Sequence, residues 1–413
     1  MKKLFAVLIL IHLTYTAAAK TESNVPVDEI RNFIDIYNVI RNDYVEEKDG
    51  KTLLDYAIEG MLSGLDPHSV YFKQSELDNF NDSTQGTFFG FGVQLDMQNG
   101  KLIIIAPIPG SPADEAGLKA RDQIIKIDDQ VIENLSLPEV MTLLKETDTV
   151  TFTVQRREEK PKTYTVTKST VEIPSVNSKL LEAGYGYLQI TQFQQKTDQM
   201  FARQLQSLLD EDINGLIVDL RNNPGGLVHV ATNIADQFLD AGLIVSTKNE
   251  NTGVEDKIHA TKNVMAEDMP LVILINEGSA SASELLAGAL QSHKRAIVVG
   301  QPSFGKGSVQ NVITLSNGDA IKLTTGRYYT PNGESIQAKG ITPDIQLSQL
   351  TVSEAEIDLL SYSEADIKGH LPPQQRDDAN SNRSQEASEK TLAKNDLQLF
   401  EALNILKVLV LTQ

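Results

Sequence analysis

The sequence predicts an α/β protein with a mostly parallel core sheet, an inserted domain that is mostly β, and helical segments at both ends. Three observations predict this arrangement. Residues 169–348 alternate apolar strands with helices, residues 83–168 hold short β runs separated by turns, and apolar residues recur at helical spacing over 26–80 and 396–413. Strands that are apolar on both faces and alternate with helices are typical of a parallel sheet covered by helices.

The chain begins with MKKLFAVLILIHLTYTAAAK, in which two lysines precede an apolar run over 4–13 and three alanines. This layout predicts a signal peptide over residues 1–19, cleaved after Ala19. The run is too short to cross a bilayer comfortably, and a retained signal anchor is the alternative. The 413 residues include no cysteine, which excludes disulfides, lipid attachment at a cysteine and a thiol nucleophile.

Four regions are expected after the signal: a helical region over 20–82, the inserted domain over 83–168, the core over 169–348 and a C-terminal region over 349–413. The last contains a polar stretch over 372–390 that lacks aromatic residues and predicts a flexible linker. A terminal helix follows, with an apolar face formed by Leu399, Leu403, Leu406 and Val410. Both helical ends predict a homo-oligomer, although the N-terminal helices would serve equally as a lid on the next domain.

The formal net charge is −19, which argues against nucleic acid and anionic membrane surfaces as partners. Solubility alone accounts for such a charge. The six histidines are scattered, without the spacing of a zinc site, so no metal is expected.

The stretches GTFFGFGVQL (86–95) and SPADEAGLKARDQIIKID (111–128) resemble a PDZ domain, with Arg121 where that family has glycine. Glycines at 90 and 92 let successive backbone N–H groups converge on an anion, and the strand that follows offers an edge to an extended peptide. A free protein C-terminus meets both conditions. The predicted peptide-binding residues are Gly90, Phe91, Gly92 and Val93.

Three serines alternate with alanines in NEGSASASELLA (276–287), where a strand ending at Ile275 leads into a helix. A serine at a helix N-terminus meets the partial positive charge that favours its alkoxide, and free N–H groups nearby can hold an oxyanion. The competing interpretation is a helix cap whose small residues allow tight packing. This segment alone does not decide between them.

A nucleophilic serine needs a base, and neither a GxSxG elbow nor the sequence context of a histidine base occurs here. Lys306, in SFGKGSVQ (303–310), is the remaining candidate. Burial can lower the pKa of a lysine from about 10.4 to about 7–8, which makes the neutral amine available. Residues 300–306 also have phosphate-loop spacing, but Gly307 stands where that loop requires Ser or Thr, so no nucleotide is expected.

Four motifs, in order, resemble the carboxy-terminal processing peptidases, also called tail-specific proteases: DLRNNPGG (219–226), NEGSASASELLAGALQ (276–291), SFGKGSVQ and GRYYTPNGESIQAKGITPDI (326–345). The likeness extends over about residues 26–345. It implies a serine endopeptidase with a Ser-Lys pair on a ClpP/crotonase-like core, carrying an inserted PDZ domain.

The resemblance implies a role for particular residues. Ser281 would be the nucleophile, Lys306 the base, and Gln310 the residue that orients the lysine. The oxyanion donors would be the backbone N–H of Ala282 and of Gly225 or Gly226, because Pro224 leaves the choice of glycine open. Ser292 stands where some relatives have an aspartate, so no acidic third member is expected.

The expected function is an exported serine endopeptidase that recognises protein C-terminal tails through its PDZ domain and hydrolyses peptide bonds through an acyl-enzyme. No metal or organic cofactor is implied. Its partners would be proteins with exposed C-termini, with room for an activating adaptor protein. The expected location is the bacterial periplasm, with secretion beyond it as the alternative. The competing class is a PDZ adaptor with an inert core, and Ser279 or Ser283 are the alternative nucleophiles.

Overall fold

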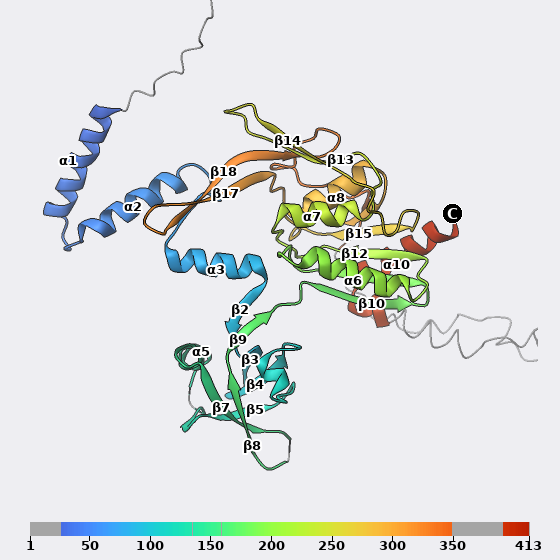
Figure 1. Cartoon of the computed structure of the whole chain (residues 1–413), viewed down its shortest axis with the longest axis horizontal. Helices are drawn as coiled ribbons and strands as arrows, with labels where there is room; N and C mark the ends of the chain where they lie inside the picture. Colours follow the sequence, from blue (N-terminus) through green and yellow to red (C-terminus); the bar gives the residue numbers. More distant parts are fainter. Residues whose placement is uncertain (1–25, 134, 158, 349–390, 413) are drawn as a thin grey trace, which may run out of the picture. The chain divides into compact units, whose positions relative to one another are not determined.

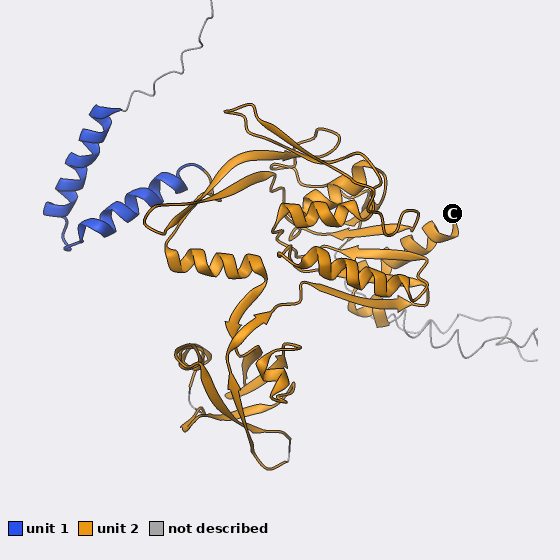
Figure 2. Ribbon diagram, in the orientation of Figure 1, with its two compact units in different colours: residues 1–65 blue, residues 66–413 orange. Residues whose placement is uncertain are grey.

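The computed structural model describes residues 26–133, 135–157, 159–348 and 391–412. The chain forms two compact units, residues 1–65 and residues 66–413 (Figure 2). The predicted signal peptide and the predicted linker over 372–390 lie outside the described residues. Within the described ranges, none of the helices combines the length and hydropathy that crossing a membrane requires.

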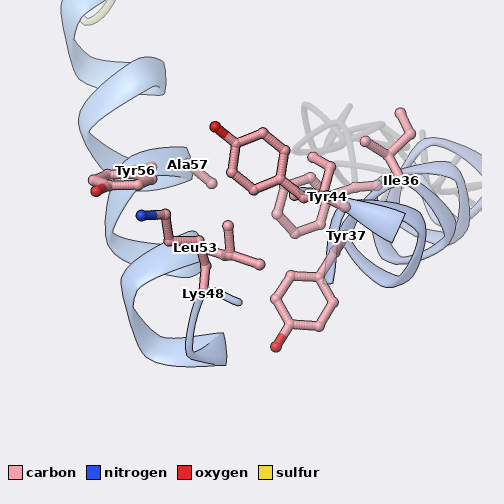
Figure 3. A pocket seen from close by; sticks show the side chains of 9 residues that line it. Ile36, Tyr37, Tyr44, Lys48, Leu53, Tyr56 and Ala57 are labelled. Carbon is pink, nitrogen blue, oxygen red and sulfur yellow. The ribbon is translucent and has the colours of Figure 1, made fainter. Parts of the chain in front are cut away.

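The first unit consists of the helices α1 (Val27–Asp43) and α2 (Gly50–Ser63). Asp49 caps α2, accepting hydrogen bonds from the backbone N–H of Lys51 and Thr52, both at 3.0 Å. Helix α1 has no buried residue, and much of its apolar surface is exposed. A pocket lies between the two helices (Figure 3), lined by Phe33, Ile36, Tyr37, Ile40, Tyr44, Lys48, Leu53, Tyr56 and Ala57.

The second unit begins with β1 (Val70–Phe72), α3 (Gln74–Gln85) and β2 (Thr87–Gly90). Strand β2 pairs antiparallel with β9 (Ser169–Glu172), so the chain enters and leaves the inserted domain through one two-stranded ribbon (Figure 1).

The inserted domain has an antiparallel sheet in the order β3-β4-β5-β7-β8, with β6 on β5, and the short helices α4 and α5. Its core contains the buried side chains of Phe91, Ile104, Val140 and Phe152. The predicted mostly β character is confirmed. The elements are β3 (Val93–Gln98), β4 (Lys101–Pro107), α4 (Pro112–Glu115), β5 (Gln123–Ile127), β6 (Gln130–Val131), α5 (Leu137–Glu146), β7 (Thr149–Gln155) and β8 (Lys162–Thr167).

The core is built on a six-stranded sheet in the order β10-β11-β12-β15-β16-β19, parallel except for β10. The strands β12 and β15 are buried throughout, as their continuous apolar sequences predict. The strands are β10 (Val176–Glu182), β11 (Tyr185–Ile190), β12 (Gly215–Asp219), β15 (Leu271–Ile275), β16 (Ile297–Gly300) and β19 (Ile345–Gln346).

Helices cover both faces of this sheet (Figure 1). Alternate side chains of β12 and β15 pack with α6 (Thr197–Leu209), α7 (Val228–Asp236) and α8 (Ala282–Ser292) on one face. The intervening side chains pack with α10 (Leu397–Leu411) on the other. The predicted terminal helix therefore finds a surface for Leu399, Leu403 and Leu406 within its own chain, whereas Val410 is only partly buried.

An ion pair also holds α10. Asp396, which caps this helix, pairs with the Arg221 guanidinium at 2.7 Å, and Arg221 pairs with the buried Asp219 at 2.6 Å. At the other end of the helix Lys407 pairs with Glu182 at 2.8 Å. Arg221 directly precedes the turn over 222–226. The ion pair between Arg221 and Asp396 therefore lies beside the turn that carries the predicted oxyanion glycines.

A second sheet, antiparallel, was not predicted from the sequence. Its order is β1-β18-β13-β14, with β17 also paired to β18. It brings residues near 70 beside residues near 322, because Val70 pairs with Lys322. The new strands are β13 (Leu243–Lys248), β14 (Glu255–His259), β17 (Ser308–Thr314) and β18 (Ala320–Tyr329).

Candidate active site

The SASAS segment lies where β15 ends and α8 begins, as predicted. Ser281 is the residue that caps α8, and its backbone has φ 56° and ψ −112°. A non-glycine residue rarely adopts a positive φ, and such strain gathers at functional sites where the surrounding structure enforces it. Ser281 is also the partly exposed serine of the three, since Ser279 and Ser283 are fully buried.

The two flanking serines bond to the backbone of the turn over 220–226. The Ser279 hydroxyl donates to the Leu220 carbonyl at 2.8 Å, and the Ser283 hydroxyl donates to the Asn223 carbonyl at 2.9 Å. The backbone N–H of Ala280 also donates to the Asn223 carbonyl, at 3.0 Å. These bonds fix the distance between the serine segment and the NNPGG turn. They explain why serines occupy positions 279 and 283 on either side of Ser281.

Within that turn the two candidate glycines differ. The Gly225 N–H donates to the Asn223 side-chain oxygen at 2.9 Å. No acceptor for the N–H of Gly226 or of Ala282 occurs among the hydrogen bonds of the described residues. Gly225, at φ 100°, lies directly against the nucleophile candidate, because a Cβ built on it would stand 2.8 Å from the Ser281 Cβ.

Glu284, which the sequence analysis did not single out, joins the serine segment to the lysine loop. Its side chain is fully buried. One carboxylate oxygen, Oε2, accepts from the backbone N–H of Ser281 at 2.7 Å and of Lys306 at 2.9 Å. The other accepts from the Ser303 hydroxyl and the Gly305 N–H, both at 2.6 Å. A buried carboxylate with four donors is fully satisfied and rigid.

Lys306 is half-buried beside this anchor. Burial lowers the pKa of its amine below the ordinary lysine value, and the Lys322 ammonium lowers it further, while the Asp66 and Glu284 carboxylates act in the opposite direction. The glycines on either side of Lys306 allow close packing of the loop. Gly305 and Gly307 let the loop pass against the backbone of residues 336–340: a Cβ on Gly307 would stand 2.4 Å from the Gln337 N, and a Cβ on Gly305, at φ 91°, would stand 3.1 Å from the Gly340 N.

Gln310 lies on β17, and its amide is held by two hydroxyl groups. Its Nε2 donates to Ser308 Oγ at 2.8 Å and to Thr324 Oγ1 at 3.3 Å. The described hydrogen bonds include none between Gln310 and Lys306, or between the Lys306 amine and Ser281.

The second predicted site lies in the inserted domain. Gly90, Phe91, Gly92 and Val93 all line one pocket, together with apolar side chains from α5. Gly92, at φ 75°, lies against Ser111, whose hydroxyl donates to the Gly92 carbonyl at 2.9 Å. Lys145 and Lys168 also line this pocket, and the Lys168 amine lies 5.4 Å from the centre of the Phe91 ring. A cation beside a glycine-rich loop suits a carboxylate.

Comparisons with known proteins cover most of the chain. The family model described as peptidase family S41 matches residues 184–347, and a PDZ domain model matches residues 90–167. A carboxy-terminal-processing protease of Bartonella bacilliformis is 37% identical over 386 residues, which cover 92% of this chain and 88% of that protein. The chain belongs to peptidase family S41. It is a serine peptidase of the carboxy-terminal processing type, and the alternative of an inert adaptor is set aside.

A second relative agrees with membership of family S41. Carboxy-terminal processing protease CtpB of Bacillus subtilis is 35% identical over 341 residues, covering 81% of this chain and 70% of that one. A model described as the N-terminal domain of activating protease CtpB matches residues 11–76. Among solved structures, a photosystem II D1 C-terminal processing protease is 29% identical, with a TM-score of 0.46, and covers 78% of this chain and 93% of that one.

For this S41 chain, the structure places Ser281, Ala282 and the glycine turn beyond the carboxyl ends of β15 and β12, and Glu284 joins the Lys306 loop to them. Gln310 lies on β17 of the antiparallel sheet, and the predicted PDZ residues surround one pocket. Sequence reasoning missed Glu284, Lys322 and Asp66. A signal for Glu284 existed, because a Ser with Glu three residues later predicts a capping box. No comparable signal pointed to the other two: Lys322 lies on β18, and Asp66 is bonded to Thr324 of the same strand.

Proposed function

We propose that Ser281 is the nucleophile of this peptidase and Lys306 its general base. In acylation the Ser281 oxygen attacks the scissile carbonyl carbon and its proton passes to the neutral Lys306 amine. When the C–N bond breaks, the ammonium returns that proton to the leaving amine. Water then attacks the ester carbonyl and gives a proton to Lys306; the C–O bond to Ser281 breaks, the Lys306 ammonium returns the proton to the Ser281 oxygen, and the acid product leaves.

The observation that supports this most is that the backbone N–H groups of Ser281 and Lys306 donate to the same carboxylate oxygen of Glu284. Burial also lowers the pKa of Lys306. For the oxyanion we assign the N–H groups of Ala282 and Gly226, because the Gly225 N–H is already bonded to Asn223. Gln310 would orient the Lys306 amine through its side-chain oxygen.

The test is cleavage of an unfolded protein with a free C-terminus by Ser281→Ala and Lys306→Met. We expect each variant to lose a factor of about 10³ or more in kcat, with thermal stability retained. Ser279→Ala and Ser283→Ala should keep measurable cleavage. Wild-type cleavage by Ser281→Ala or Lys306→Met would overturn the assignment.

We further infer that the PDZ pocket takes the C-terminal carboxylate of the substrate, on the N–H groups of Gly90–Val93 with Lys168 nearby. A tail peptide with a free carboxylate should bind at least tenfold more tightly than the same peptide with a C-terminal amide. Equal affinities for the two peptides, measured by fluorescence anisotropy, would refute it.

We infer export to the bacterial periplasm from the signal-like segment over 1–19, with secretion beyond it as the alternative. Cell fractionation and N-terminal sequencing test this, and the expected new N-terminus is Lys20. A cytoplasmic protein that retains Met1 would contradict it.

Homo-oligomer formation is proposed through α1, whose apolar residues stay exposed within its own unit. An activating adaptor remains an expected partner. Sedimentation should show that Ile30→Asp with Ile34→Asp reduces the mass to that of a monomer. An unchanged mass, or a monomeric wild type, would refute this role for α1.

A further inference from the structure

Asp66 stands at the start of the second unit, and its carboxylate accepts four hydrogen bonds. Three are local: from the backbone N–H of His68 at 2.8 Å, from the backbone N–H of Ser69 at 3.0 Å and from the Ser69 hydroxyl at 2.7 Å. The fourth comes from the hydroxyl of Thr324, 258 positions further along the chain, at 3.2 Å. The Thr324 N–H also donates to Ser69 Oγ at 3.2 Å, so residues 66–69 are fastened to β18 at two points.

These bonds have a fixed direction. An ionised carboxylate can only accept, so the Thr324 hydroxyl must use its single proton toward Asp66. The Thr324 oxygen can then only accept hydrogen bonds from other groups, and Gln310 Nε2 donates one at 3.3 Å. The second N–H of that amide is taken by Ser308 Oγ at 2.8 Å. Both donors of Gln310 are thereby used, and its oxygen is left as the free acceptor.

We propose that Asp66 is a positioning residue for the peptidase reaction: through Thr324 it sets which way the Gln310 amide faces, so that an acceptor rather than a donor is offered to the Lys306 amine. This rests on the proposed function, in which Lys306 is the base and the Gln310 oxygen orients its amine. An amide turned the other way would present an NH₂ group to an amine whose lone pair must stay free.

The charges around Lys306 give this proposal a signature in the pH profile. Among the described residues, the titratable groups that interact electrostatically with Lys306 are Asp66, Glu284, Lys322 and His68. Asp66 favours the ammonium form and therefore raises the pKa of Lys306, against the larger effect of burial. Neutralising Asp66 lowers that pKa, so the acid limb of the rate profile moves to lower pH.

The primary variant is Asp66→Asn, which can keep the local turn but can also donate to Thr324. The Thr324 hydroxyl is then free to donate toward Gln310 and turn its amide. We expect kcat to fall about tenfold with KM unchanged, and the acid limb of kcat/KM to move to lower pH. Asp49→Asn is the matched control, because Asp49 accepts from Lys51 N, Thr52 N and the Thr52 hydroxyl but has no Thr324 equivalent.

Thr324→Val removes the relay without changing charge, so kcat should fall about tenfold while the acid limb stays in place. Thr324→Ser keeps the hydroxyl and should restore activity. The double variant Asp66→Asn, Thr324→Val should be no slower than the slower single variant, since both act through Gln310. Thermal stability and tail-peptide binding check that each variant is folded.

Wild-type kcat in Asp66→Asn, additive losses in the double variant, or an equal loss in Asp49→Asn would overturn the proposal. Ser281→Ala and Lys306→Met separate its failure from that of the proposed function. If those two are inactive and Asp66→Asn is unaffected, only the role of Asp66 is wrong. If Lys306→Met cleaves as the wild type does, the proposed base is wrong as well.

Discussion

The backbone N–H groups of Ser281 and Lys306 donate to the same carboxylate oxygen, Oε2 of Glu284, at 2.7 and 2.9 Å. Residues 25 positions apart are thereby held by one buried side chain. Glu284→Gln replaces one of the two acceptor oxygens with an NH₂ donor, which would face N–H groups. We expect a loss of about 2–3 kcal/mol in the free energy of unfolding and at least a tenfold loss of kcat, measured by urea denaturation and tail cleavage.

Glu139→Gln is the matched control, because Glu139 is likewise the third residue of a helix and accepts from the N–H of its cap residue Ser136 at 2.7 Å. That site is exposed and lies in the PDZ domain, so the change should cost much less stability than Glu284→Gln and leave kcat unaltered. Equal losses in the two variants would show that Glu284 is only a helix cap.

Gly225→Ala places a methyl group against the proposed nucleophile, Ser281. The added Cβ would lie 2.7 Å from the Ala280 carbonyl oxygen and 2.8 Å from the Ser281 Cβ, and the residue has φ 100°. We expect cleavage to be lost and stability to fall by about 2–4 kcal/mol. Gly253→Ala, at φ 68° with no atom within 4 Å, should cost only the backbone strain of about 1–2 kcal/mol and keep full activity. An active Gly225→Ala enzyme would contradict the close packing of the turn on Ser281.

Lys322→Met tests the electrostatics of the base. Lys322 lies on β18 with its amine 5.4 and 5.6 Å from the ring centres of Phe72 and Phe80, and its charge lowers the pKa of Lys306. Without that charge the Lys306 pKa rises, so the acid limb of kcat/KM moves to higher pH. Activity should fall at neutral pH and recover at alkaline pH, opposite in direction to Asp66→Asn.

Lys248→Met, on β13 of the same sheet, is the control for this charge effect. Lys248 is exposed and pairs with Glu250 at 3.5 Å, and it is not among the groups that act on Lys306. Its pH profile should match that of the wild type. A limb displaced equally in both variants would point to the overall charge of the protein instead.

Asp396→Asn weakens the attachment of α10 beside the oxyanion turn. The change removes one of the two carboxylates that pair with the Arg221 guanidinium, which would then form an ion pair with Asp219 alone. We expect a loss of about 1–3 kcal/mol in stability and a several-fold lower kcat with KM unchanged. Lys407→Gln removes the ion pair at the other end of α10 and should reduce stability without a separate effect on kcat. The reverse pattern would exclude a link between Asp396 and the turn.

Much of the fold could be predicted because the buried strands of the core are continuous apolar runs, such as LVILI at Leu271–Ile275. The lysine, the serines and the glycine turn could be located because they lie at the carboxyl ends of parallel strands or just beyond them. The pairing of β18 with β1 could not be predicted. It joins segments about 250 residues apart, and nothing in either segment specifies the other.

The same limit applies to the site. Asp66 and Lys322 act on Lys306 through space, so their importance depends on a register that only the folded chain reveals. Glu284 had a local signal, but a capping glutamate is usually exposed, and three of its four donors come from a distant segment, residues 303–306. Local sequence predicts where a helix starts, but it does not predict which distant residues bond to the first turn of that helix.

The left-handed backbone of Ser281 also restricts which amino acid can supply the hydroxyl group. At φ 56° a side chain branched at Cβ is strained, so threonine is disfavoured although its hydroxyl has the same chemistry. The hydroxyl proposed as the nucleophile is therefore constrained twice: by its proton affinity, and by the number of carbon substituents that its main chain can accommodate.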